Sequence, residues 1–161
     1  MKMFTGGNGF KYDFDEVMEE IVTEAKLNDV AIMVGTDSQN HKEHTTFVTA
    51  VVCHRVGRGA RLFYVRDKVR RINSVRERML REAELSIQVA LEYQNYVDTQ
   101  YPELNDCIFE VHADVNAYPE HESNRALKEI VGWITGCGFV CKIKPDAPIA
   151  STVADKYAIM H

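Results

Sequence analysis

The sequence predicts an α/β domain built on a mixed five-stranded sheet flanked by helices. Apolar runs and helical periodicity give the order helix, three strands, helix, strand, helix, strand, helix. Two tight connections join the first three strands, which is typical of an antiparallel meander. The last two strands each follow a helix, so right-handed crossovers should return them parallel to the first strand. Together these observations predict the strand order 3-2-1-4-5.

The amino-terminal part of the chain divides into a loose segment and a helix. Residues 1–12 are rich in glycine and are predicted to be irregular. From Asp13 onward apolar residues recur at helical spacing, and Asp13 with Glu16 has the pattern of a capping box. We expect residues 1–29 to pack on a domain formed by residues 30–161.

The remaining elements follow from local patterns. Strands are predicted from buried or β-branched runs at residues 30–39, 45–55, 60–69, 107–116 and 139–145. Helices are predicted at residues 74–97, 123–135 and 147–160, with Asn73 or Ser74 as the cap of the long one.

Composition places the chain among globular proteins. Hydrophobic residues make up 45% and charged residues 27% of its 161 residues. We expect no membrane association and a cytoplasmic location, because no apolar run approaches 18 residues and no secretory signal is visible. The four cysteines (Cys53, Cys107, Cys137 and Cys141) match no common zinc spacing, which favours buried reduced thiols.

Charge is distributed unevenly along the chain. Residues 55–81 contain nine arginines and Lys68 against only Asp67 and Glu77, a balance of +8. The whole chain carries −5, so the rest carries −13. Such asymmetry indicates either a face for a polyanion or a set of solvated faces that offset an acidic remainder.

Four acidic residues occupy positions suited to a metal site. Asp37 and Asp114 close apolar strands, and Glu82 and Asp155 lie within helical patterns. Carboxylates that converge repel one another unless a divalent cation lies between them. Oxygen-only clusters suit Mg²⁺ or Mn²⁺, and two such ions about 4 Å apart can cleave phosphodiesters.

Helical phase selects Glu82 among three glutamates of the long helix. At about 100° per residue, Glu82 lies inside a mostly apolar stripe, whereas Glu77 and Glu84 lie on the opposite face. The stripe consists of Val75, Met79, Ser86, Val89 and Tyr93. A glutamate in a buried stripe needs a cation or a donor, and a salt bridge with Lys144 is the structural alternative to a metal.

This strand order, with aspartates ending its first and fourth strands, resembles the ribonuclease H-like fold. The strings VGTDSQ, HADVN, KPDA and VADK further resemble the uncharacterised YkuK-type branch of bacterial ribonuclease H-like proteins. The resemblance implies a site of four acidic residues. Asp37 and Asp114 match the two strand aspartates, Glu82 the glutamate of the first crossover helix, and Asp155 the aspartate of the last helix.

Several neighbours of this site have open roles. Asp146 is the rival of Asp155 as the fourth ligand, although its position before the helix favours a capping role. His112 alternates with Asp114 and either handles protons or is a satisfied structural histidine. Ser38 and Asn116 are candidates for orienting the carboxylates.

Three functions are compatible with these residues. The first is a Mg²⁺- or Mn²⁺-dependent nuclease in which Asp37, Glu82, Asp114, Asp155 and His112 form the catalytic site and the arginine-rich segment holds phosphates. The second is a non-catalytic nucleic-acid-binding or partner-binding domain of the same fold. The third, a nucleotide phosphotransferase, is disfavoured because GTDSQ is a poor phosphate loop. DNA or RNA as substrate, endo- or exonucleolytic cleavage, and oligomeric state stay open.

Overall fold

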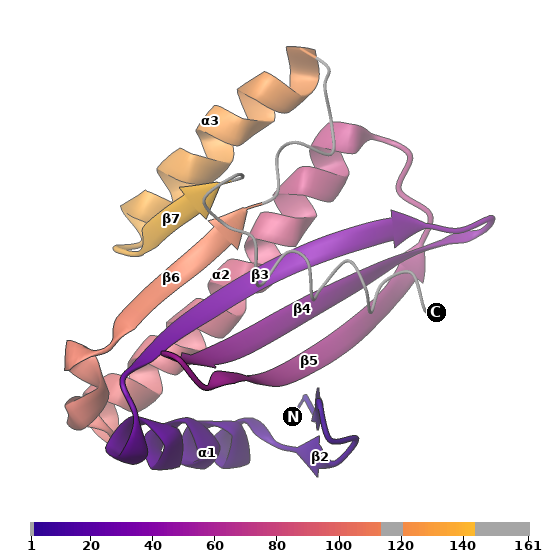
Figure 1. Cartoon of the computed structure of the whole chain (residues 1–161). Coiled ribbons are helices and arrows are strands. Elements are labelled where there is room, and N and C mark those ends of the chain that lie inside the picture. The colour runs from indigo at the N-terminus through magenta and orange to yellow at the C-terminus, as the bar shows by residue number, and fades with distance from the viewer. Residues whose placement is uncertain (1, 114–120, 144–161) are drawn as a thin grey trace.

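The computed structural model describes residues 2–113 and 121–143 (Figure 1). The predicted helix at residues 147–160 lies outside this part of the chain. The strands are β1 (Phe4–Gly6), β2 (Lys11–Tyr12), β3 (Val30–Asn40), β4 (His44–Arg55), β5 (Gly59–Arg70), β6 (Ile108–Ala113) and β7 (Val140–Ile143). The helices are α1 (Phe14–Leu27), α2 (Val75–Thr99), α3 (His121–Gly136) and the short 3₁₀ helix η1 (Pro102–Asp106).

The strands form one mixed sheet with the order β2-β1-β5-β4-β3-β6-β7. Its last five strands reproduce the predicted order, with β3, β4 and β5 antiparallel and β6 and β7 parallel to β3 and to each other. The α/β class is therefore confirmed. The predicted strand number is corrected from five to seven, because β1 and β2 extend the sheet beyond β5.

The two additional strands come from the segment that the sequence predicted to be loose. Thr5 of β1 pairs with Tyr64 of β5, and β2 returns antiparallel to β1. Their apolar side chains are buried: Phe4 packs on Phe14 with ring centroids 5.6 Å apart, and Tyr12 meets Phe63 edge-on at 5.2 Å. Long-range aromatic packing thus orders a segment whose glycine content indicates a loop.

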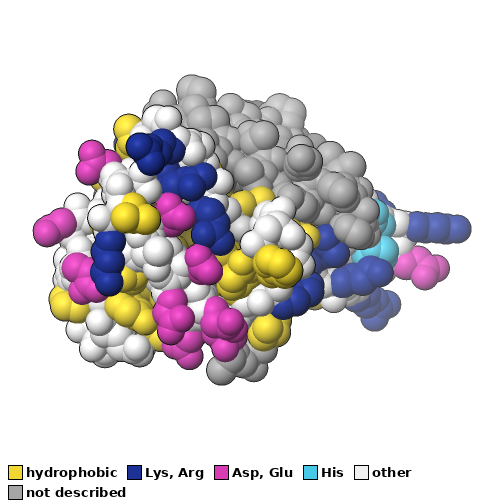
Figure 2. All heavy atoms as spheres, turned by 60° about the horizontal axis from the view of Figure 1, so that its bottom comes forward, with side chains coloured by type: hydrophobic (Ala, Val, Ile, Leu, Met, Phe, Trp, Pro, Cys, Tyr) yellow, Lys and Arg dark blue, Asp and Glu magenta, His cyan; other side chains and the backbone are white. Residues whose placement is uncertain are grey.

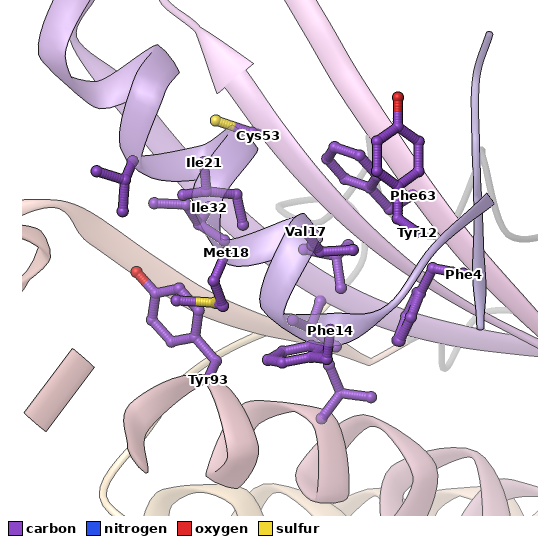
Figure 3. Close-up of a cluster of buried hydrophobic side chains, with 14 of the residues drawn as sticks. Phe4, Tyr12, Phe14, Val17, Met18, Ile21, Ile32, Cys53, Phe63 and Tyr93 are labelled. Atoms are coloured by element: carbon purple, nitrogen blue, oxygen red, sulfur yellow. The ribbon is translucent and has the colours of Figure 1, made fainter. Parts of the chain in front are cut away.

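The helices α1, α2 and α3 pack on the same face of the sheet. The apolar side of α1 packs between Tyr93 of α2 and strand residues such as Ile32 of β3. Figure 3 shows this for Val17, Met18 and Ile21. A second apolar cluster joins α2 and α3 over Val111 of β6. The capping box of Asp13 and Glu16 is present at the start of α1, and Ser74 caps α2. The domain boundary at residue 30 stays a prediction.

The opposite face of the sheet carries its own apolar cluster of Met33, Val48, Ala50 and Val52. Because side chains alternate along a strand, odd-numbered residues of β3 belong to this face and even-numbered ones to the helix-covered face. No helix in the described part of the chain is long and apolar enough to cross a membrane.

Candidate active site

The polar end of β3 forms the centre of the candidate site. Thr36, Asp37 and Ser38 follow the apolar residues of this strand, and all three are buried, with at most 6% of each exposed. Among the described residues, the pairing of β3 with β6 extends to Gly35 and His112. Burying three consecutive polar residues is costly unless each finds a hydrogen-bonding partner.

Ser38 donates hydrogen bonds to two acidic side chains from different elements. Its backbone N–H donates to Oδ1 of Asp37 at 2.9 Å, and its hydroxyl donates to Oε2 of Glu82 at 2.5 Å. Glu82 is 5% exposed. Hydrogen bonds to ionised acceptors are stronger than neutral ones, so Ser38 compensates part of the cost of burying both carboxylates. The fold thereby brings Asp37 and Glu82 to the same serine.

A chain of hydroxyl groups anchors α2 against β3 beside this serine. Thr36 Oγ1 donates to Thr49 Oγ1 at 3.0 Å and lies 2.7 Å from Ser86 Oγ. Ser86 stands one helical turn after Glu82, so its contact with Thr36 sets the rotation of α2 that directs Glu82 towards Ser38. Sequence reasoning gave Thr36, Thr49 and Ser86 no role. For Ser86 the sequence did contain a signal, because this polar residue lies inside the mostly apolar stripe of the long helix.

The glutamates of α2 differ in their surroundings as helical phase predicts. Glu82 is buried, Glu84 is half-buried and paired with Arg81, and Glu77 is exposed. Glu82 is therefore the glutamate that α2 presents to the polar end of β3. Its alternative partner, Lys144, lies outside the described residues.

Asp37 and Glu82 reach Ser38 from the two sides of the sheet. Thr36 and Ser38 hydrogen-bond to α2, so alternation places the Asp37 side chain on the face opposite the helices.

His112 shares the sheet face of Asp37. It pairs with Gly35, two residues before Asp37, and the same face carries its contact Glu110 and its β7 partner Lys142. The ring is buried, with Nε2 3.2 Å from Glu110 Oε1. Burial lowers the pKa of His112, Glu110 raises it and Lys142 lowers it further. Burial therefore favours the neutral imidazole, which can accept a proton.

The remaining residues of the predicted site are three aspartates and one asparagine. Asp114, Asp155, Asp146 and Asn116 lie outside the described residues. Within residues 2–113 and 121–143, no group of three or more histidine, cysteine or acidic side chains is close enough to hold a metal ion. Asp37 and Glu82 supply oxygen donors, the type that Mg²⁺ and Mn²⁺ prefer, so the donor chemistry fits these ions. Their role as ligands stays a prediction.

The structure separates the arginine-rich segment into different environments. Arg55 and Arg61 pair with Glu24 and Glu20 of α1. Arg76 pairs with Glu129 of α3 at 2.7 Å. These arginines help to hold helices to the sheet or to each other. Lys68 and Arg70, at the far end of β5, are exposed.

Comparison with known proteins agrees with this architecture. The ribonuclease H-like family model matches residues 14–158. The chain is 31% identical over 156 residues to the uncharacterized protein YkuK of Bacillus subtilis (strain 168), a match that covers 89% of this chain and 90% of YkuK. No solved structure gave a significant match. With both the model and this relative spanning most of its length, the chain belongs to the ribonuclease H-like family.

Proposed function

We propose that this chain is a divalent-metal-dependent nuclease that hydrolyses phosphodiester bonds. The observation that carries the proposal is the position of Ser38, which donates to a strand carboxylate and a helix carboxylate at once. A divalent cation bound to these buried carboxylates would offset the cost of burying their negative charge. Membership of the ribonuclease H-like family supports this reading of the pair.

Asp37 and Glu82 would hold Mg²⁺ or Mn²⁺, with Asp114 and Asp155 completing the ligand set. Bound ions of this type activate a water nucleophile and stabilise the leaving 3′ oxygen. Ser38 would keep the two carboxylates in fixed orientations, which preserves the geometry that ion binding requires. His112, on the face of Asp37, would accept a proton near the reacting phosphate.

Cleavage of labelled single-stranded and duplex oligonucleotides in Mn²⁺ or Mg²⁺ tests this function. Glu82→Gln should abolish cleavage, because it removes a charged ligand while keeping the side-chain shape. Glu84→Gln is the matched control on the same helix and should cleave at close to the wild-type rate. If wild type cleaves no substrate, or both variants lose activity equally, the proposed site is wrong.

The fourth ligand requires a separate comparison. We expect Asp155→Asn to impair metal-dependent cleavage and Asp146→Asn to leave it nearly unchanged, because asparagine caps a helix about as well as aspartate. The reverse outcome would assign the fourth position to Asp146.

A non-catalytic nucleic-acid-binding domain is the second candidate. The observation that favours it is that Ser38 already gives buried Glu82 a hydrogen bond, as the fold alone requires. In that case Ser38 would serve only to satisfy Glu82 inside the fold. Nucleic-acid binding that is unchanged in Asp37→Asn, together with no cleavage under any metal condition, would support this alternative.

A further inference from the structure

We propose that the face of β5 shared with Asp37 binds the phosphates of one single nucleic-acid strand through Arg66, Lys68 and Arg70. This inference deepens the proposed function by naming the form of the substrate, and its binding component can be tested without catalysis. It gives Arg66, Lys68 and Arg70 a role in binding phosphates, whereas other arginines of the same segment pair with acidic side chains.

Strand register places these cations on the sheet face of Asp37. Asp37 pairs with Val48 of β4, and Val48 pairs with Arg66 of β5. Directly opposed residues of antiparallel strands share a face, so Asp37 and Arg66 lie on the same side. Arg66 also lies over Tyr64, its neighbour two residues earlier, with 5.8 Å between the guanidinium and the ring centroid. Lys68 and Arg70 follow at alternate positions and share that face.

The three cations form a row that begins beside the candidate site. Alternate residues of an antiparallel strand are about 6.8 Å apart, a separation close to that of successive phosphates along a nucleic-acid strand. Arg66 is two strands from Asp37, about 10 Å across the sheet. From there the row leads to Arg70, which pairs with His44 at the end of the long β3–β4 hairpin. A strand held on this row would therefore have one end about 10 Å across the sheet from Asp37.

Within the described residues, none of these three side chains forms an ion pair with a carboxylate. The intervening Asp67 belongs to the opposite face and pairs with Lys2 at 3.1 Å. Figure 2 shows several lysine and arginine side chains gathered at the projecting end of the hairpin, together with histidine and an acidic side chain. The row thus keeps positive charge available for a polyanion.

The chain segment that follows the row is tied to the hairpin end. Asn40 Nδ2 donates to the carbonyl oxygen of Ile72 at 3.1 Å, and the N–H of Ile72 donates to Thr45 Oγ1 at 2.9 Å. Arg71 donates through Nη1 to the carbonyl oxygen of His41. These contacts hold the chain just after Arg70 in place, which lowers the entropy cost of ordering a ligand on the row.

A single strand fits this arrangement better than a duplex. The residues that lie beside the row on the same face are Val48, Thr46 and His44 of β4, and then Asp37 and Gln39 of β3. On this part of the described sheet there is no second parallel row of lysine or arginine. A duplex presents two phosphate backbones separated by its grooves, and one row can contact only one of them. The charge pattern therefore matches one backbone.

Binding should be measured by fluorescence anisotropy in EDTA, so that neither cleavage nor metal contributes. The probes are labelled single-stranded DNA and RNA of one sequence and the corresponding DNA duplex. Wild type should bind a single strand more tightly than the duplex, with log affinity falling linearly with log salt. The double variant Lys68→Gln/Arg70→Gln should flatten that slope by about 1.4, at about 0.7 for each lost phosphate contact.

Arg58→Gln is the matched control. Arg58 is exposed in the turn between β4 and β5, at the opposite end of the sheet, and belongs to the same basic segment. It should bind like wild type. Equal losses in Arg58→Gln and in the double variant, an unchanged slope in the double variant, or equal affinity for the duplex would overturn the proposal.

Failure of this surface and failure of the nuclease are distinguishable. Asp37→Asn should keep metal-free binding, because Asp37 contributes no positive charge to the row. Strand binding without cleavage would retain the surface and reject the nuclease. Cleavage that is insensitive to Lys68→Gln/Arg70→Gln, with an unchanged salt slope, would reject the surface and retain the nuclease.

Discussion

At the scale of single residues, Ser38 has a double role. Its backbone N–H and its hydroxyl donate to different carboxylates, so a substitution can remove one bond and leave the other. The side chain of Ser38 is therefore the most specific probe of how Glu82 is held. A backbone donor cannot be deleted by changing the side chain, and Asp37 keeps its contact in any variant that preserves the strand.

We predict that Ser38→Ala lowers the free energy of unfolding by about 1–3 kcal/mol, because it removes a donor from a buried carboxylate. Urea denaturation measures the loss, and Ser38→Thr, which keeps a hydroxyl, should recover part of it. In a Glu82→Gln background the same change should cost less, since the charged acceptor is gone. Equal costs in both backgrounds would show that the hydroxyl does not act through Glu82.

His112 should make stability depend on pH in the mildly acidic range. Burial lowers its folded-state pKa below the ordinary value of 6.5. Between the two values the unfolded chain binds more protons, so this contribution to stability is fully present above pH 6.5 and is lost as pH falls through the folded-state pKa. Urea unfolding at a series of pH values should show a smaller acid loss in His112→Gln than in wild type.

Glu110 supplies the opposing test of the same residue. Its carboxylate favours the protonated imidazole and raises the pKa of His112. Glu110→Gln should therefore lower that pKa further and increase the loss of stability in acid. A smaller acid loss in Glu110→Gln than in wild type would contradict the assigned cause.

At the scale of elements, the hairpin of β1 and β2 depends on close packing at one glycine. A Cβ atom added at Gly6 would lie 2.7 Å from Asn8 Oδ1 and 2.7 Å from Cε2 of Tyr12. At Gly7 the nearest atom, Cβ of Leu62, would be 3.8 Å away, an ordinary contact. The two adjacent glycines therefore differ in the space available for a side chain.

We predict that Gly6→Ala destabilises the protein by about 1–3 kcal/mol, because the buried ring of Tyr12 must move to relieve overpacking. Gly7→Ala is the matched control and should have a much smaller effect. Thermal and urea unfolding of both variants measure the difference. Equal effects would mean that backbone entropy, and not the contact with Tyr12, limits this position.

At the scale of the whole molecule, a bound metal ion would link a strand to a helix and stabilise the fold. An ion that binds the folded chain at ten times its dissociation constant adds about 1.4 kcal/mol to the free energy of unfolding. For a domain of this size that corresponds to a rise in Tm of about 3–5 °C. We predict such a rise for wild type in millimolar Mn²⁺.

Asp37→Asn should lose most of this response, since it removes a predicted ligand without changing the backbone hydrogen bonds of β3. Thermal melts with Mn²⁺ and with EDTA measure both proteins. If Mn²⁺ leaves the Tm of wild type unchanged, or raises the Tm of Asp37→Asn by the same amount, these carboxylates do not bind the ion.

Local sequence patterns were sufficient for the five strands β3 to β7, the capping of α1 and the rotation of α2. Each depends on residues close together in the chain: the apolar run of β3, a cap three residues from its partner, and the 100° step that buries Glu82 while leaving Glu77 exposed. The catalytic roles of Asp37, Glu82, Asp114, Asp155 and His112 remain predictions, because chemistry depends on how distant residues converge and on ions that a periodic pattern does not encode.

Only the tertiary structure decided which distant groups meet. Pairing of Thr5 with Tyr64 turns a glycine-rich segment into an edge of the sheet. Pairing with Glu20 binds Arg61 to a helix, whereas Lys68 remains exposed in the same basic segment. Strand register places Asp37 and Arg66 on one face. Register and packing arise between residues far apart in sequence, and a shift of one position would move each of these side chains to the other face of the sheet.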